Sequence, residues 1–332
     1  MTIGEKQPDQ LKDAAAFWDR EVINPTHVSW MAHPAVRRYI NASISGDPDC
    51  WPINWLVRTF PGLHMSSALS IGCGTGELER DLLFRGICES MVAFDGSQVS
   101  IDVARAEAQR AGLSDRVTYY VADFNKPRLP VSTYDAVFFH QSAHHVAKLE
   151  KLFRAVLRAL RPGGMLYLDE FVGPSRSDWN DERVGVLRAI NALLPREVRL
   201  HGELPLPIQC DDPSEAIRSS EILEQLRLGF DIEYLRGYGG NILSVLFEAM
   251  RDPEDDLVDG LIAAERELLR AGEPPFHAVI VARPKGGVRK VFASVRYFVE
   301  PKASLRNALG AVRTFTEPKL KRLVRAVRAQ VG

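Results

Sequence analysis

Apolar and polar positions along residues 67–172 alternate between two patterns. Short runs that are almost continuously apolar are separated by longer stretches in which apolar residues recur every three or four positions. The short runs predict buried strands, and the longer stretches predict amphipathic helices. The predicted strands are 67–72, 90–95, 116–122, 134–139 and 164–172, and the helices between them are 76–86, 97–112 and 147–161. This alternation favours a parallel sheet covered by helices on both faces.

Helical patterns precede this region at 8–21, 33–45 and 51–60, and they predict a helical N-terminal cap over residues 1–62. The cap is rich in aromatic residues, among them Trp18 and Trp30. Large aromatic side chains usually serve as buried packing, which is one interpretation of the cap. The alternative is a lid over a substrate pocket.

The second half of the chain is mostly helical, with predicted helices at 180–193, 214–228, 240–250 and 254–271. Two later runs, 230–238 and 276–283, are typical of strands, and the second is rich in β-branched residues. This late pair fits a sheet that ends in an antiparallel edge. We therefore expect an α/β domain over 63–283, with helical substrate-side insertions at 174–228 and 240–272, followed by a separate segment over 284–332.

The C-terminal segment 284–332 is basic and amphipathic. It carries twelve Lys and Arg residues against two acids, whereas the whole chain has a formal net charge of −1. Apolar residues recur at helical spacing in three pieces that Pro301 and Pro318 separate. Such a tail can pack on the body of the protein or on a second copy. The alternative is peripheral binding to an anionic membrane surface.

The remaining composition is that of a globular protein, with 45% hydrophobic and 26% charged residues among 332. No apolar run approaches the roughly 18 residues that indicate a membrane-spanning helix. The first ten residues are polar and show no signal-peptide pattern. The four cysteines are scattered without a CxxC pair, which favours free thiols, a cytoplasmic location and no cysteine metal site.

A glycine turn follows the first predicted strand, with Gly72, Gly74 and Gly76 in a Gly-x-Gly-x-Gly pattern. Glycines allow the backbone to approach a ligand closely, and the helix behind them offers unpaired N–H groups. The turn alone is weak evidence, because the dinucleotide pattern is one residue longer. Ligands of parallel sheets bind beyond the carboxyl ends of the strands, so the residues after the later strands indicate which ligand it is.

Acidic residues follow the second and third predicted strands. Asp95 can accept hydrogen bonds from both hydroxyls of a ribose. It could instead cap the next helix, but Ser97 is better placed for that, which would leave Asp95 free. Asp123 can accept from an adenine amino group, with Ala122 and Phe124 flanking the ring. Taken alone, Asp123 would more often be a turn former.

In this order the motifs resemble those of class I S-adenosylmethionine (SAM)-dependent methyltransferases. The family's motifs correspond here to residues 71–76, to Asp95, to Ala122-Asp123 and to Leu-Arg-Pro-Gly-Gly at 160–164, over about 110 residues. The resemblance implies a Rossmann-like α/β fold with a seven-stranded, mostly parallel sheet whose last strand is antiparallel, and SAM as cofactor. One departure is Ser70, which stands where the family often has an acid that helps to hold the methionine ammonium group.

The resemblance also implies which residues bind the cofactor. They are Ser70, Gly72, Cys73, Gly74, Gly76, Asp95, Gly96, Ser97, Ala122, Asp123, Phe124, His140 and Gln141. A looser resemblance, over 170–174, 218–223 and 238–240, is to bacterial methyltransferases of natural-product and cell-surface glycan pathways. It favours a small-molecule or glycan acceptor.

Histidines gather where the acceptor is expected. His140, His144 and His145 follow the fourth strand within six residues, and Glu170 follows the fifth. Methyl transfer to a hydroxyl needs an aligned acceptor and a base for its proton, and histidine suits that role near neutral pH. We expect His144 to be the base, with His145 packing behind it or orienting it. Glu170 could accept a hydrogen bond from the acceptor hydroxyl or orient a histidine.

Other functions fit less well. The segment after the fourth strand does not resemble the base-stacking motif of amino-methylating DNA enzymes, and the bulk of the chain is acidic, so nucleic acid is not expected. A divalent-metal O-methyltransferase would need carboxylates after both strand four and strand five. Only the second is present, so no metal is expected. The alternatives to a SAM-dependent O-methyltransferase are a SAM-binding protein without turnover, recruited through its basic tail, and an NAD-dependent oxidoreductase, which the glycine spacing disfavours.

Overall fold

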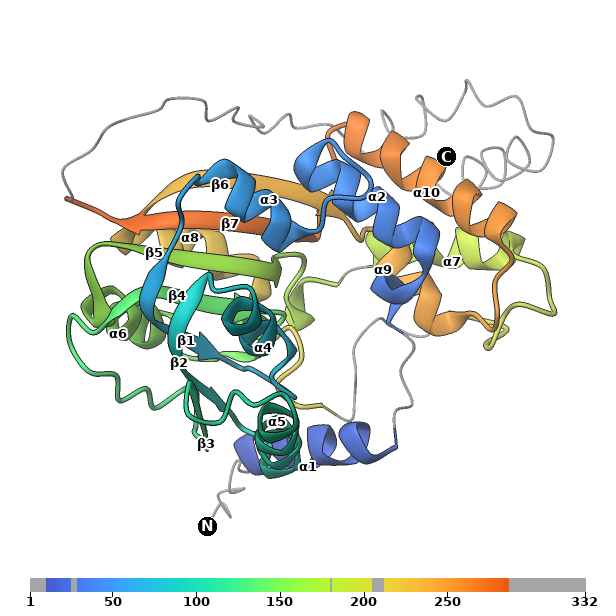
Figure 1. The fold of residues 1–332 in the computed structure, drawn as a ribbon. Coiled ribbons are helices and arrows are strands. Elements are labelled where there is room, and N and C mark those ends of the chain that lie inside the picture. The colour runs from blue at the N-terminus through green and yellow to red at the C-terminus, as the bar shows by residue number, and fades with distance from the viewer. Residues whose placement is uncertain (1–9, 25–28, 180, 205–211, 287–332) are drawn as a thin grey trace, which may run out of the picture.

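The computed structural model describes residues 10–24, 29–179, 181–204 and 212–286 (Figure 1). The first nine residues and the predicted basic segment beyond residue 286 lie outside the described residues. Within the described part, no helix combines the length and apolar character that crossing a membrane requires.

One sheet of seven strands organises the described chain. Its strands are β1 (Met65–Ile71), β2 (Cys88–Asp95), β3 (Val117–Val121), β4 (Tyr134–His140), β5 (Leu160–Phe171), β6 (Phe230–Gly239) and β7 (His277–Pro284). They lie in the order β3-β2-β1-β4-β5-β7-β6. Strands β1 to β5 are parallel, whereas β7 runs antiparallel to both neighbours. This confirms the predicted Rossmann-like sheet with its antiparallel last strand.

Helices cover both faces of the sheet. The helices α2 (Pro34–Ser45), α3 (Pro52–Thr59), α4 (Glu77–Phe84) and α5 (Gln98–Arg110) bury apolar residues against one face, together with Ala68 of β1, Phe138 of β4 and Tyr167 of β5. The helices α6 (Leu149–Ala159) and α8 (Ile222–Gly229) pack on the other face against Leu69 and Val137. Successive strand residues therefore point to opposite faces, as burial on both sides requires.

Two groups of helices lie beside these layers. Helix α1 (Gln10–Ile23) runs along α5 at one end of the molecule (Figure 1). At the other end, α7 (Asp181–Leu193), α9 (Leu243–Leu246) and α10 (Asp255–Arg270) pack together next to α2 and β6. The helical residues of the cap therefore separate, with α1 on the α5 side and α2 and α3 on the sheet.

The structure corrects two of the predicted helices. Residues 214–221 do not belong to the predicted 214–228 helix, because they form turns and a 3-10 turn ahead of α8. Asp212 stabilises the first of these turns by accepting from both the backbone N–H and the hydroxyl of Ser214. The predicted 240–250 helix shortens to α9 and a following 3-10 turn. Its start is held instead by Glu265, which accepts the N–H groups of Gly240, Ile242 and Leu243.

Candidate functional site

A cleft of about 900 Å³ opens at the carboxyl ends of β1, β2, β4 and β5. The glycine turn and the start of α5 form one part of its wall, and helix α1 and the α2–α3 region form others. The residues that matter below and that line it are Trp18, Arg37, Ser70, Gly72, Cys73, Gly74, Glu79, Asp95, Gly96, Ser97, Phe124, His140, Gln141, Ser142, His145, Tyr167, Asp169 and Ser214.

Most of the predicted cofactor residues border this cleft, but three do not: Gly76, Ala122 and Asp123. Asp123 is engaged in its own turn, where one oxygen accepts the Asn125 N–H at 2.8 Å and the other lies 3.3 Å from the Lys126 ammonium. Its predicted contact with adenine stays a prediction. Phe124 does line the cleft, and it packs against Phe94 at the sheet end.

The glycine turn is shaped by close contacts that only glycine permits. Gly72 and Gly76 both have positive φ, at 73° and 79°. A Cβ at Gly72 would lie 2.3 Å from Ser142 Cβ, and one at Gly76 would lie 2.5 Å from the Tyr119 hydroxyl. The turn therefore packs directly on β3 and on the segment after β4. This packing brings the ends of β1 and β4 together at the point where the strand order reverses.

Asp95 holds the turn and the start of α5 in register. One carboxylate oxygen accepts the Gly74 N–H at 2.9 Å, and the other accepts the Ser97 N–H at 2.9 Å. The prediction that Ser97 caps α5 is confirmed, since its hydroxyl accepts the Ser100 N–H at 3.0 Å. The expectation that Asp95 would be left free is wrong. Each carboxylate oxygen still has a lone pair for a ribose hydroxyl, so the two roles are compatible.

Helix α1 is joined to the cleft by polar contacts. Asp19 accepts the Ser97 hydroxyl at 2.5 Å and the Val99 N–H at 3.1 Å, both at the start of α5. Trp18 lines the cleft, donates its indole N–H to Asp212 at 3.0 Å and meets the His145 ring edge to face at 5.5 Å. Helix α1 therefore forms a wall of the cleft, and of the two interpretations of the cap this placement favours the lid.

His144 lies between two carboxylates rather than in the open cleft. Its Nδ1 hydrogen bonds with Glu170, and its Nε2 lies 3.7 Å from a Glu215 oxygen. Glu170 is fully buried and also accepts the N–H groups of Ser142 and Ala143, at 2.9 and 2.6 Å. Burial favours the neutral ring, but the two glutamates outweigh it and raise the His144 pKa to about 10. The ring is therefore an imidazolium at neutral pH and cannot accept a proton.

His145 lines the cleft and has the opposite electrostatic environment. Burial and the neighbouring His144 charge lower its pKa, so the ring is neutral at pH 7. Its Nδ1 lies 3.1 Å from the Ser214 hydroxyl, which itself lies 2.7 Å from Asp212. Because the Ser214 hydroxyl donates to Asp212, it accepts from the Nδ1–H of His145. The ring nitrogen left to accept a proton is Nε2.

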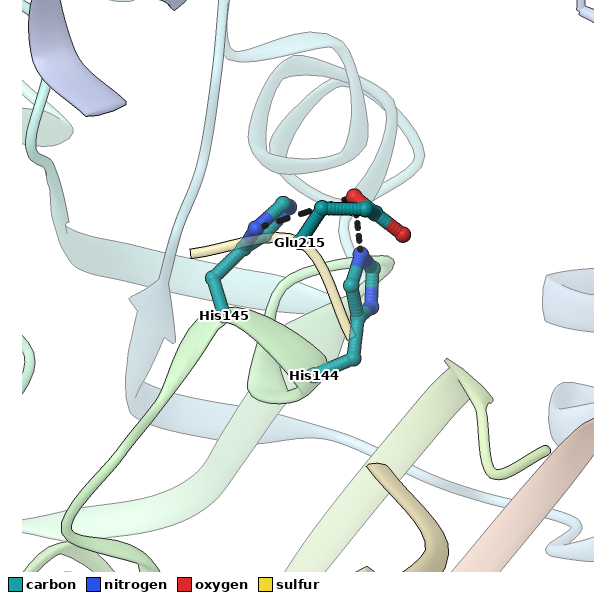
Figure 2. Close-up of side chains that lie close together, drawn as sticks. All are labelled: His144, His145 and Glu215. Carbon is teal, nitrogen blue, oxygen red and sulfur yellow. Dashed lines mark ion pairs between the residues drawn. The ribbon is translucent and has the colours of Figure 1, made fainter. Parts of the chain in front are cut away.

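Figure 2 shows how His144, His145 and Glu215 converge, with the Glu215 carboxylate facing both rings. The ligand atoms of the three lie within 4.8 Å of one another, a grouping that can hold a metal ion. The contacts described above also explain how these residues can lie together without a metal, because the positive charge of the His144 imidazolium stabilises the nearby carboxylates of Glu170 and Glu215. That no metal is needed remains a prediction.

A second polar network borders the cleft after β5. The Tyr238 hydroxyl donates to Asp169 at 2.6 Å, and the Gln141 amide donates to the Tyr238 oxygen at 3.1 Å. Gln141 has a φ of 51°, and its backbone N–H donates to the Asp169 carbonyl at 2.8 Å. The His140 Nε2 lies 3.8 Å from Asp169. This network orients the segment that leads from β4 to the two histidines.

Sequence reasoning missed three acidic residues of this region. Asp212 and Glu215 lie about 70 residues beyond the histidines they contact, within a segment that was predicted to be partly helical. Glu79 sits in the first turn of α4, where acids are common on exposed helix starts. For Glu79 the available signal was the glycine turn that directly precedes α4. No local signal marked Asp212 or Glu215.

Comparisons with known proteins bear on the family and the fold. A sequence family described as a methyltransferase domain matches residues 69–168. A sterol 24-C-methyltransferase of Clavispora lusitaniae is 25% identical over 168 residues, which are 50% of this chain and 40% of that protein. One of Aspergillus fumigatus is 28% identical over 104 residues, 31% of this chain and 27% of that protein. The chain thus spans less than half the length of these curated relatives.

A solved structure shows the same fold. The crystal structure of geranyl diphosphate C-methyltransferase from Streptomyces coelicolor A3(2), in complex with Mg²⁺, geranyl diphosphate and S-adenosyl-L-homocysteine, superimposes with a TM-score of 0.52. The match covers 84% of this chain and all of that one, at 15% identity. Residues 69–168 therefore match a methyltransferase domain, and the described chain has the Rossmann-like fold of class I SAM-dependent methyltransferases.

Proposed function

We propose that the protein transfers the methyl group of SAM to a small molecule, with a hydroxyl oxygen as acceptor and His145 as general base. The residues of the cleft fit the cofactor: Asp95 has lone pairs for a ribose, Phe124 offers a ring face, and the buried carboxylate of Glu79 suits a cation. SAM supplies a methyl group that is already activated on a sulfonium centre. The protein then has to align the acceptor and remove its proton.

The observation that carries the base assignment is the difference between the two adjacent histidines. His144 was the base expected from the sequence, but an imidazolium between Glu170 and Glu215 has no lone pair to offer. His145 is neutral, lines the cleft and is oriented through Ser214 by Asp212. A base whose other ring nitrogen is fixed by a hydrogen-bonded partner is the arrangement that general-base catalysis uses.

A second candidate is methylation at carbon. The curated relatives are named sterol 24-C-methyltransferases, and a structural neighbour is a geranyl diphosphate C-methyltransferase. Aromatic rings line the cleft, among them Trp51 and Trp18, and the Trp18 ring meets His145 at 5.5 Å. Such walls suit an apolar acceptor whose carbon loses a proton after transfer. A glycan hydroxyl, which the looser resemblance favours, has less support from these aromatic contacts.

The experiment measures S-adenosylhomocysteine release with a panel of phenolic, terpenoid, sterol and sugar acceptors. Wild-type protein should turn over with at least one hydroxylated small molecule, and His145→Gln should lower kcat by roughly 100-fold or more. His64→Gln is the matched control, because His64 is half exposed and precedes β1, at the sheet end opposite the cleft. Equal rates for His145→Gln and wild type would overturn the base assignment, and product analysis separates methylated oxygen from methylated carbon.

Titration calorimetry with SAM and NAD tests the cofactor itself, and tighter NAD binding would end the proposal.

A further inference from the structure

Glu79 is a buried carboxyl group that lines the cleft. It lies in the first turn of α4, three residues after Gly76, and its side chain is fully buried. Neither carboxylate oxygen has a hydrogen-bond partner among the described residues. Burial raises the pKa of Glu79, and the neighbouring Ser70 hydroxyl, at a geometry outside that of a hydrogen bond, offsets this only in part. A buried carboxylate without a partner is costly, so this site is incomplete as it stands.

The groups around Glu79 do not supply the missing partner. Burial raises the pKa of Cys73 and of Tyr119, the nearby Glu79 carboxylate raises both further, and neither group carries a positive charge at neutral pH. The two cationic groups that act on it are His140 and Arg80. His140 is half exposed and faces Asp169, and Arg80 donates to the Thr75 carbonyl at 2.6 Å. The chain therefore leaves a buried carboxyl group at the cleft without an ion-pair partner in the described residues.

The position of Glu79 selects its ligand. Glu79, Ser70 and the glycine turn line the same cleft, and Ser70 is buried directly before the turn on β1. SAM has one primary ammonium group, and a buried carboxylate is the strongest partner for it that the protein can offer. We propose that Glu79 binds the ammonium group of the methionine moiety of SAM, so that a carboxylate on α4 takes the place of the acid that Ser70 lacks on β1.

This inference rests on the proposed use of SAM, and it makes the departure at Ser70 intelligible. A serine at position 70 contributes a hydroxyl and little volume, which leaves room for a carboxylate approaching from α4. A charge-assisted hydrogen bond in a buried site contributes about 1.5–3 kcal/mol, which corresponds to roughly 10- to 150-fold in affinity. Arg37, a residue of α2, also lines the cleft. The Nε of its guanidinium donates to the Met31 carbonyl at 3.2 Å.

The test compares two ligands on the wild type and three variants by titration calorimetry. The ligands are S-adenosylhomocysteine and its deamino analogue, which lacks only the ammonium group. Glu79→Gln should weaken S-adenosylhomocysteine by roughly 10- to 100-fold and leave the affinity for the deamino analogue unchanged. Glu89→Gln is the charge-matched control, because Glu89 is exposed at the opposite end of β2, and it should bind both ligands as the wild type does.

Each outcome decides a separate question. Equal weakening of both ligands by Glu79→Gln would mean a structural role and would overturn the inference, as would unchanged binding of S-adenosylhomocysteine. Failure of the wild type to bind either ligand would instead overturn the proposed function, and the inference with it.

The double variant Ser70→Asp/Glu79→Gln places an acid on β1 and should regain part of the lost affinity for S-adenosylhomocysteine alone. Thermal unfolding checks folding, and Glu79→Gln should unfold no earlier than wild type, since it removes a buried charge without a partner.

Discussion

Gly72 lies directly against Ser142, so closely that a methyl group added to Gly72 would come within 2.3 Å of the Ser142 Cβ. The Ser142 hydroxyl also donates to the Ile71 carbonyl at 2.7 Å, and its backbone N–H donates to Glu170. One close contact therefore joins the glycine turn to the segment that carries the histidines. The cofactor side and the acceptor side of the cleft are mechanically connected at this point.

The first prediction concerns this contact. Gly72→Ala should destabilise the protein by about 2–4 kcal/mol, because it combines positive φ with a clash against a side-chain atom that cannot move away. Gly74→Ala is the matched control, since Gly74 has a φ of 51° and no atom lies within 4 Å of the place its new methyl group would take. The control should cost about 1–2 kcal/mol. Urea unfolding measures both. Similar losses in the two variants would mean that backbone strain, and not the Ser142 contact, determines the effect.

The second prediction concerns the pH range over which the contact between His144 and Glu215 stabilises the folded protein. The His144 pKa is raised to about 10, so its contribution to stability is complete below about 6.5 and is lost as the pH rises towards 10. Burial favours the protonated form of Glu215, but the nearby His144 charge outweighs it and lowers the Glu215 pKa to about 2, so its contribution is complete above about 4.5 and is lost as the pH falls. Glu215→Gln should therefore cost about 1–3 kcal/mol between pH 5 and 6.5 and less on either side.

Unfolding free energies of wild type and Glu215→Gln, measured from pH 3 to pH 10, test this window. Glu224→Gln is the control, because Glu224 is an exposed acid on α8, and its difference from wild type should be small and flat with pH. A difference between wild type and Glu215→Gln that did not change with pH would mean that Glu215 stabilises the site by packing alone.

The third prediction concerns the attachment of α1. Asp19→Ala removes the acceptor of both the Ser97 hydroxyl and the Val99 N–H, so α1 should open more often from α5. We expect amide hydrogen exchange in α1 to become roughly tenfold faster, with α5 much less affected because Ser97 still caps it. Asp13→Ala, at an exposed position of the same helix, should leave exchange unchanged. Unchanged exchange in Asp19→Ala would show that apolar packing alone holds α1.

The fourth prediction concerns the basic segment, which lies outside the described residues. The full chain should co-sediment with vesicles that contain anionic lipid, and the attraction should weaken at high salt. A chain that ends at Gly286 keeps all of β7 and loses residues 287–332. It should stay in the supernatant. Equal partitioning of the two proteins would exclude membrane binding by this segment and favour its packing on the body or on a second copy.

The local features of the fold were predictable from the sequence. The alternation of apolar runs and helical spacing predicted the strands, and Gly72, Gly74, Asp95, His140 and His145 line the cleft where the strand-end rule places them. These features depend on residues close in sequence, whose periodicity and turn chemistry act within one element. The helix boundaries at 214 and 240 were not predictable, because Asp212 and Glu265 set them through hydrogen bonds to particular backbone groups.

The sequence by itself determined the succession of strands along the chain, the glycine turn and the presence of adjacent histidines, because each depends only on residues that are close together in the sequence. Only the tertiary structure decided what those histidines can do. Glu170 and Glu215 come from distant segments, and in a buried site their charges make His144 an imidazolium, while burial and that imidazolium charge keep His145 neutral. The same holds for Glu79, whose burial without a hydrogen-bond partner among the described residues follows from how α4 packs on the sheet. Burial strengthens each such interaction, because water no longer screens the charges.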